Sequence, residues 1–153
     1  MNAVERFTSA AAAVGLTPTV QRFPDGTRTA ADAAAAVGCS VGQIVKSLIF
    51  SVDGAPILIL TSGANQVDTD LVGAYLGASL EKADAAVVRE STGFAIGGTP
   101  PLGHATPLRT LLDEDLLTHD EVWAAAGTPD TCFPITPQEL ASITEAEVIA
   151  VRN

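Results

Sequence analysis

The chain has 153 residues, the length of one ordinary domain, and we expect residues 1–153 to fold as a single unit. Apolar residues make up 47% of it, which argues against a disordered chain. Eighteen acidic against eight basic side chains give a formal net charge of -10, which argues against a broad surface that coats nucleic acid. Any nucleic-acid contact must therefore be local.

Neither the cysteines nor the N-terminus indicates a secreted or membrane protein. Cys39 and Cys132 stand far apart without a CxxC motif, so the sequence predicts neither a zinc cluster nor a disulfide scaffold. The first residues lack the apolar core of a signal peptide and the roughly 20 apolar residues of a transmembrane span. We expect a cytoplasmic protein that makes no membrane contact.

Hydrophobic periodicity, capping residues and turn residues predict helices and strands that interleave along the chain. The expected helices span residues 2–14, about 30–37, from Asp68 or Thr69 to about Leu76, from Asp84 through Arg89, and from Thr136 to about Ile143. The expected strands span residues 19–23, 44–52, 57–60, 108–113, 122–126, 131–135 and 147–151. The best-marked features are the hairpin around Asp53-Gly54 and the helix start at Thr136-Pro137.

Several of the expected strands are joined by connections too short for a parallel crossover, which needs a dozen or more residues. The predicted fold class is therefore α/β of the α+β type. We expect a mixed, mostly antiparallel, barrel-like sheet with helices packed around it.

Lys46 is one of two lysines in the chain and stands inside an apolar strand. Strand alternation places it on the same side as Leu48 and Phe50, with Val45 and Ile49 on the other. Because an isolated buried charge is costly, its ammonium either reaches solvent at the strand end or meets a polar or anionic group in a cleft. The sequence leaves both possibilities open.

Residues 92–104 are rich in glycine and proline. Glycines let a backbone approach a ligand closely and prolines fix φ, so this loop can present free N–H groups to an oxyanion or a carbonyl. The alternative is a surface turn between two strands. Gly97-Gly98 followed by Pro100-Pro101 matches no nucleotide-binding fingerprint.

The remaining candidate groups give weak signals. The two histidines, His104 and His119, are candidate general bases. The candidate carboxylates to orient such a base are Asp113, Asp115 and Asp120. A lone histidine after a glycine, however, is more often a loop residue. No nucleophile elbow surrounds a serine, and no HExxH motif predicts a metal. We expect a mechanism without metal or cofactor.

Three segments in register carry a resemblance to a known family. They are Gln43–Leu48, Ser91–Gly103 and Ala125–Leu140. Together they resemble the YbaK/EbsC family, stand-alone relatives of the editing insertion domain of bacterial prolyl-tRNA synthetase. The similarity covers the chain from about Val14 to Val151.

The resemblance implies a trans-editing deacylase, which hydrolyses the ester between a wrong amino acid and the 3′ end of a tRNA, commonly tRNA(Pro). The family's invariant lysine falls on Lys46, and its GxxxP motif falls on Gly97 to Pro101. In this family the loop positions the aminoacyl carbonyl through its backbone, and the lysine helps to hold the terminal adenosine region. The implied catalytic residues are Lys46, Gly97 and Pro101. The implied substrate-binding residues are Phe23, Ser47, Gly98, Thr99, Pro100, His104 and Gly127.

The expected partner is the tRNA 3′ acceptor end, and we do not expect the protein to bind DNA. Because the acidic surface predicts weak, salt-sensitive tRNA affinity, prolyl-tRNA synthetase is a further candidate partner.

The cysteinyl-deacylating branch has a Ser-Gly-Gly segment where this chain has Ala125-Ala126-Gly127, so the resemblance does not assign cysteine as the substrate. The alternatives are a non-catalytic binding module for an aminoacyl-tRNA end or small ligand, and a structural subunit of a synthetase complex. Replacing Lys46 by Ala is expected to abolish hydrolysis with little change in stability.

Overall fold

The computed structural model describes residues 1–27 and 29–152 and confirms the predicted mixed α/β fold. The α-helices are α1 (Ala3–Ala13), α2 (Ala30–Val37), α3 (Thr69–Leu76), α4 (Ala85–Thr92) and α5 (Pro137–Thr144). The strands are β1 (Gln21–Arg22), β2 (Ile44–Val52), β3 (Ala55–Ser62), β4 (Leu80–Lys82), β5 (Arg109–Asp113), β6 (Val122–Ala125), β7 (Thr131–Ile135) and β8 (Glu147–Ile149). Two short 3-10 helices, η1 (Val41–Gln43) and η2 (Glu114–Thr118), complete the described elements.

The helix starts follow the capping residues in the sequence. Thr29 accepts a hydrogen bond from the Asp32 N–H at the start of α2, and Thr136 accepts one from the Glu139 N–H at the start of α5. Asp68, rather than Thr69, caps α3. Such caps satisfy backbone donors that the first turn of a helix leaves without partners.

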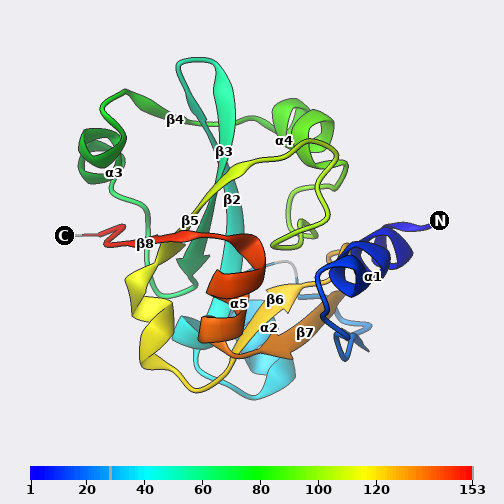
Figure 1. The fold of residues 1–153 in the computed structure, drawn as a ribbon. Coiled ribbons are helices and arrows are strands. Elements are labelled where there is room, and N and C mark those ends of the chain that lie inside the picture. The colour runs from blue at the N-terminus through cyan, green and yellow to red at the C-terminus, as the bar shows by residue number, and fades with distance from the viewer. Residues whose placement is uncertain (28, 153) are drawn as a thin grey trace.

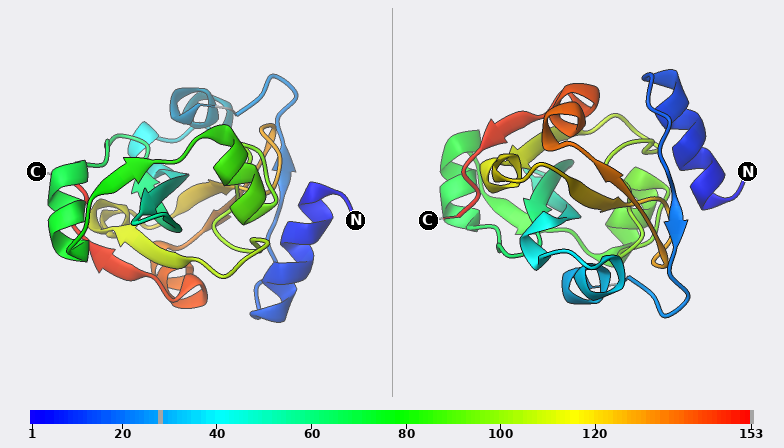
Figure 2. Two further views of the ribbon diagram at one scale, coloured as in Figure 1. Left: turned by 90° about the horizontal axis from the view of Figure 1, so that it is seen from above. Right: turned by 90° about the horizontal axis from the view of Figure 1, so that it is seen from below.

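The strands form one mixed sheet in the order β1-β7-β6-β2-β3-β5-β8, with β4 paired to β2 off this path. The long β2–β3 hairpin rises at the centre in Figure 1, with α3 and α4 on either side of it. The two chain ends lie on opposite sides of the molecule (Figures 1 and 2). Among the described residues, no helix has the length and apolar character needed to cross a membrane.

One edge of β2 is shared between two short strands. At its start Ile44 and Val45 pair with β6, and at its end residues 50–52 pair with β4. The Ala83 N–H also donates to the Ile49 carbonyl at 3.1 Å. Residues 46–48 consequently have no strand beside them on this edge among the described residues, while β3 pairs with β2 along its other edge.

The two faces of β2 belong to different parts of the core, as the alternation predicts. Val45 and Ile49 lie in a large cluster that contains residues of α1, β5, β6, β7 and α5. Phe50 lies in a smaller cluster with residues of β3, β5, β8 and α3, against which Leu48 also packs. Lys46 therefore projects to the side of the smaller cluster.

Apart from shifts of a few residues at the ends of other elements, the main differences from the expectation concern two strands. The strand predicted over 19–23 is reduced to Gln21 and Arg22, because only these residues pair with β7. The sequence also fails to predict β4, whose pattern of one buried residue and two exposed charged ones does not alternate over enough residues to mark a strand. That short strand matters here because it limits the open edge of β2.

Candidate active site

A cavity of about 460 Å³ lies against the open edge of β2. Its walls come from β2, α2, the β4–α4 connection, the loop around Gly97, β6 and β7. Lys46 and Lys82 line it, and among the described residues no Asp or Glu does. In a chain with a net charge of -10, this cavity is a local cationic site.

The ammonium of Lys46 is held by a backbone carbonyl. Its Nζ donates to the Asn65 O at 2.5 Å. Burial lowers the pKa of Lys46, while the charge of Asp113 raises it and that of Lys82 lowers it. Of the two possibilities that the sequence left open, a polar partner in a cleft is therefore the one observed. Removal of the Lys46 side chain would leave the Asn65 carbonyl without this donor.

Ser47 lines the cavity and carries a hydroxyl that the described part of the folded protein does not use. Its Oγ is buried and has no hydrogen-bond partner among the described residues. Because alternate strand residues direct their peptide groups to opposite edges, the N–H and C=O of Ser47 point to the same open edge as those of Ile49. A buried hydroxyl without a partner costs about 1–3 kcal/mol, which a bound ligand can recover.

The loop around Gly97 forms the wall opposite β2. The carbonyl of Ala95 accepts from the Gly98 N–H and from the Thr99 Oγ1, each at 3.0 Å. Gly97 has φ +87°, a conformation that residues with a side chain rarely adopt. Among the described residues nothing accepts a hydrogen bond from the N–H of Gly97 or Thr99, and both residues line the cavity. Backbone donation by this loop to a ligand remains a prediction.

Behind this wall the loop is held by close backbone contacts. A Cβ on Gly98 would lie 2.8 Å from the Thr128 Cα, so this position requires glycine. A Cβ on Gly127 would in turn lie 2.8 Å from the Ala3 carbonyl oxygen. Gly98 and Gly127 therefore hold the loop against the segment between β6 and β7 and do not line the cavity themselves.

His104 braces the same loop from outside the cavity. Its Nε2 lies 2.7 Å from the Pro100 O, and its ring packs edge-on against Phe94. Burial lowers the pKa of His104, and the Pro100 carbonyl opposes this shift. Because its nitrogen is engaged with Pro100, His104 is separate from the aspartates on β5 and η2. His119 is the histidine whose charge acts on Asp115.

The structure brings together four of the predicted site residues and leaves six outside the cavity lining. Lys46, Ser47, Gly97 and Thr99 line the cavity. Phe23, Gly98, Pro100, Pro101, His104 and Gly127 do not line it. Phe23 is half-buried at the end of β1, where its N–H donates to the Asp130 carbonyl at 2.7 Å. Both prolines are buried beneath the loop.

Several cavity residues were missed from the sequence. Lys82 had one usable signal, since it is the second of two lysines, but nothing in the sequence placed it near Lys46. Cys132 lines the cavity as a buried thiol whose pKa burial raises to about 11. Within residues 1–27 and 29–152, no three His, Cys, Asp or Glu side chains gather as a metal site would require.

Comparison with known proteins identifies the family. Residues 24–143 match the family described as the aminoacyl-tRNA editing domain. Over 130 residues the chain is 31% identical to the uncharacterized protein YwhH of Bacillus subtilis (strain 168), a match that covers 84% of this chain and 83% of that protein. It is 32% identical over 107 residues to the proline-tRNA ligase of Maridesulfovibrio salexigens, covering 69% of this chain but only 18% of the ligase.

A solved structure agrees closely over the whole fold. It is described as a candidate trans-editing enzyme for prolyl tRNA synthetase and shares 46% sequence identity with this chain. The TM-score is 0.95, over 100% of this chain and 98% of that one.

Fold and cavity together define a small mixed α/β domain with a cavity that two lysines line. The chain belongs to the aminoacyl-tRNA editing domain family. The predicted family and the predicted class of function, aminoacyl-tRNA editing, are confirmed.

Proposed function

We propose that this domain hydrolyses the ester of a misacylated tRNA in trans, and that its substrate is tRNA(Pro) carrying a small non-cognate amino acid. One observation carries the proposal. Lys46 lines the cavity together with Gly97 and Thr99, whose N–H groups have no acceptor among the described residues, and no carboxylate is among the described lining residues. Such a site suits a ligand that joins a phosphodiester to a polarised carbonyl.

The two walls divide the work of hydrolysis. Lys46 pairs with a phosphate or with the terminal adenosine region and so fixes the tRNA end. Water, positioned in the cavity or by a group of the substrate, attacks the ester carbonyl carbon, and the N–H groups of Gly97 and Thr99 stabilise the negative charge that develops on oxygen. The ester bond then breaks, the 3′-hydroxyl of the tRNA takes the proton, and a free amino acid leaves.

The remaining residues of the predicted site have supporting roles in this proposal. Ser47 donates or accepts a hydrogen bond with the aminoacyl group through its unpartnered hydroxyl. Pro100 and Pro101 fix the backbone of the loop, which His104 braces through the Pro100 carbonyl. Gly98 and Gly127 allow the close approach that keeps the loop in place. Phe23 supports the adjoining end of β1.

The reaction needs no metal or cofactor in this proposal, because backbone donors supply the charge stabilisation. The whole of residues 1–153 acts as one editing domain in the cytoplasm. Its partners are the tRNA acceptor end and prolyl-tRNA synthetase, which would add affinity that the acidic surface lacks, and they do not include DNA or membranes. Unchanged tRNA affinity after addition of the synthetase would count against that partner.

The test is deacylation of tRNA(Pro) charged separately with alanine, cysteine, serine, threonine, 2-aminobutyrate and proline, by the wild-type protein and by Lys46→Ala. We expect loss of at least one small non-cognate amino acid, with the prolyl ester spared and with dependence on Lys46. Since one methylene is worth only about 1–3 kcal/mol, neighbouring amino acids in this series should differ by about 10- to 200-fold. No hydrolysis of any ester, with binding to the aminoacyl end retained, would instead identify a non-catalytic binding module.

A further inference from the structure

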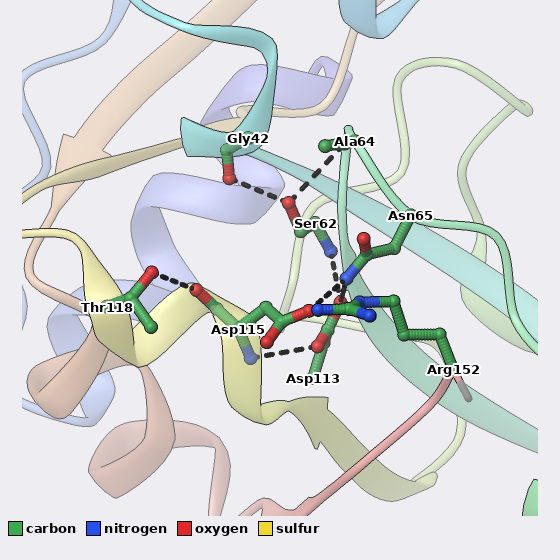
Figure 3. Close-up of polar contacts among 8 residues, drawn as sticks. All are labelled: Gly42, Ser62, Ala64, Asn65, Asp113, Asp115, Thr118 and Arg152. Atoms are coloured by element: carbon green, nitrogen blue, oxygen red, sulfur yellow. Dashed lines mark hydrogen bonds and ion pairs between the residues drawn. The ribbon is translucent and has the colours of Figure 1, made fainter.

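A polar cluster surrounds Asn65, the residue whose carbonyl accepts a hydrogen bond from the Lys46 ammonium. It consists of Ser62, Asn65, Asp113 and Asp115, with Arg152 at its outer end (Figure 3). Asp113 is 0% exposed, and none of these residues lines the cavity. No sequence pattern connects them with Lys46.

Asn65 is the centre of this cluster. Its side-chain Nδ2 donates to the Asp113 Oδ2 and to the Asp115 Oδ2, each at 2.8 Å. Its backbone N–H donates to the Ser62 carbonyl at 2.9 Å. Both the side chain and the backbone of Asn65 are therefore fixed, and its carbonyl oxygen is the group that receives the Lys46 ammonium.

The carboxylate of Asp113 is held mainly by N–H donors. Its Oδ2 also accepts from the Ser62 N–H at 3.0 Å, and its Oδ1 accepts from the Asp115 N–H at 2.9 Å. None of the ion pairs among the described residues includes it. A buried carboxylate without a contacting cation is costly, so this arrangement is a poor way to gain stability alone.

We propose that Asn65 and Asp113 are positioning residues that fix the Lys46 ammonium toward the cavity. Asp113 locks the turn that follows β3, this turn presents the Asn65 carbonyl, and the carbonyl holds one of the three ammonium protons. The other two protons remain for the substrate. This inference rests on the proposed function for its consequence in catalysis, but the ordering of Lys46 itself is independent of any substrate.

Asp113 also acts on Lys46 through its charge. The charged groups that influence Lys46 are Asp113 on β5, which raises its pKa, and Lys82 on β4, which lowers it. Burial opposes the charged form of Lys46 most strongly. The charge of Asp113 therefore opposes the effect of burial and favours the charged form of Lys46.

The chain offers a clean readout because it contains two lysines, Lys46 and Lys82. In protein labelled with 13C at lysine Cε, Lys82→Arg assigns the two NMR signals. We expect Asp113→Asn to move the titration of the Lys46 signal to lower pH and to leave that of Lys82 nearly unchanged. We expect Asn65→Ala to make the two Hε protons of Lys46 equivalent, because the turn that presents the carbonyl of residue 65 loses its side-chain bonds to Asp113 and Asp115 and no longer fixes the ammonium.

The functional readout is single-turnover deacylation, which we expect to fall about 10- to 100-fold in Asn65→Ala, since misplacement by about 1 Å costs up to 10²-fold. Leu140→Ala is the control for lost stability, because Leu140 is a buried core residue of α5 outside the cluster. It should lower the melting temperature and leave the Lys46 signal unchanged.

If Asp113→Asn and Asn65→Ala both fold and both show the same Lys46 NMR signal and titration as the wild-type protein, the proposal is overturned. If Asp113→Asn does not fold, Asn65→Ala decides alone. If the wild-type protein hydrolyses no ester while the Lys46 signal still responds to Asn65→Ala, the proposed function fails and the positioning of Lys46 stands.

Discussion

The two walls of the cavity are built in different ways. On the β2 wall the proposed function rests on a side chain, and the Lys46 ammonium donates to a carbonyl that a polar cluster holds. On the loop wall the proposed function rests on the backbone, and the peptide groups around Gly97 belong to a turn about the Ala95 carbonyl. A side-chain wall should be sensitive to charge, whereas a backbone wall should be sensitive to conformation. Substitutions that change only the charge or only the backbone conformation can therefore test the contribution of each wall to deacylation separately.

The largest effect is expected for Lys46→Ala. Hydrogen bonds to charged groups are worth about 1.5–3 kcal/mol, so kcat/KM should fall about 10- to 150-fold. Lys82→Ala is the matched control, because Lys82 lines the same cavity but has no ion pair among the described residues. Its effect should be several times smaller, and equal losses in the two variants, measured by single-turnover deacylation, would contradict a special role for Lys46.

The backbone wall is tested by Gly97→Ala. A left-handed conformation costs a residue with a side chain roughly 1–2 kcal/mol, so the loop should shift and deacylation should fall about tenfold. Gly54→Ala is the matched control, because Gly54 has φ +83° in the β2–β3 turn and no atom within 4 Å of an added Cβ. It should lose comparable stability and keep full activity. A fully active Gly97→Ala protein would exclude this loop as the carbonyl site.

A smaller effect is expected for Ser47→Ala, which removes a hydroxyl without a partner. A neutral hydrogen bond is worth about 0.5–1.5 kcal/mol, so kcat/KM should fall about 2- to 12-fold. Thermal unfolding should show no loss of stability, because the folded protein makes no bond with this oxygen among the described residues. Lower stability together with unchanged kinetics would show that the Ser47 hydroxyl stabilises the fold and does not bind the substrate.

The smallest effect is expected for His104, which contacts the Pro100 carbonyl. It is a change in how the stability of the protein depends on pH. Burial lowers the pKa of His104, so the folded state favours the neutral ring. Its contribution is present above the ordinary pKa of histidine and is lost as pH falls toward the lowered value in the folded state. Urea unfolding should therefore show a smaller loss between pH 7 and pH 5 in His104→Gln than in the wild-type protein.

Much of the fold could be predicted from local sequence. β2 has a run of β-branched and apolar residues, and Thr29, Asp84 and Thr136 each cap the helix that they were expected to start. β4 could not be predicted, because its three residues form a strand only by pairing with the end of β2. The open edge of β2, and with it the cavity, depends on that pairing.

The candidate site was predictable only in part. Lys46 and the loop at Gly97 stood out by residue type and by resemblance to a family. Asn65 and Asp113 did not, since they are 48 residues apart and meet only through the parallel pairing of β3 with β5. Local patterns identify residues that act on a substrate more readily than the residues that hold them in place.

The most direct measurement is an NMR titration of the wild-type protein with a non-hydrolysable analogue, 3′-alanylamino-3′-deoxyadenosine 5′-phosphate. We predict that the largest amide shifts occur at Ser47, Gly97 and Thr99, with a shift of the Lys46 Cε signal. A second hollow, which residues of α3 and the α3–β4 connection line between Thr69 and Leu80, should be unaffected. Shifts that cluster beside α3 and leave both walls of the cavity unchanged would contradict the assignment of this cavity as the site of ester hydrolysis.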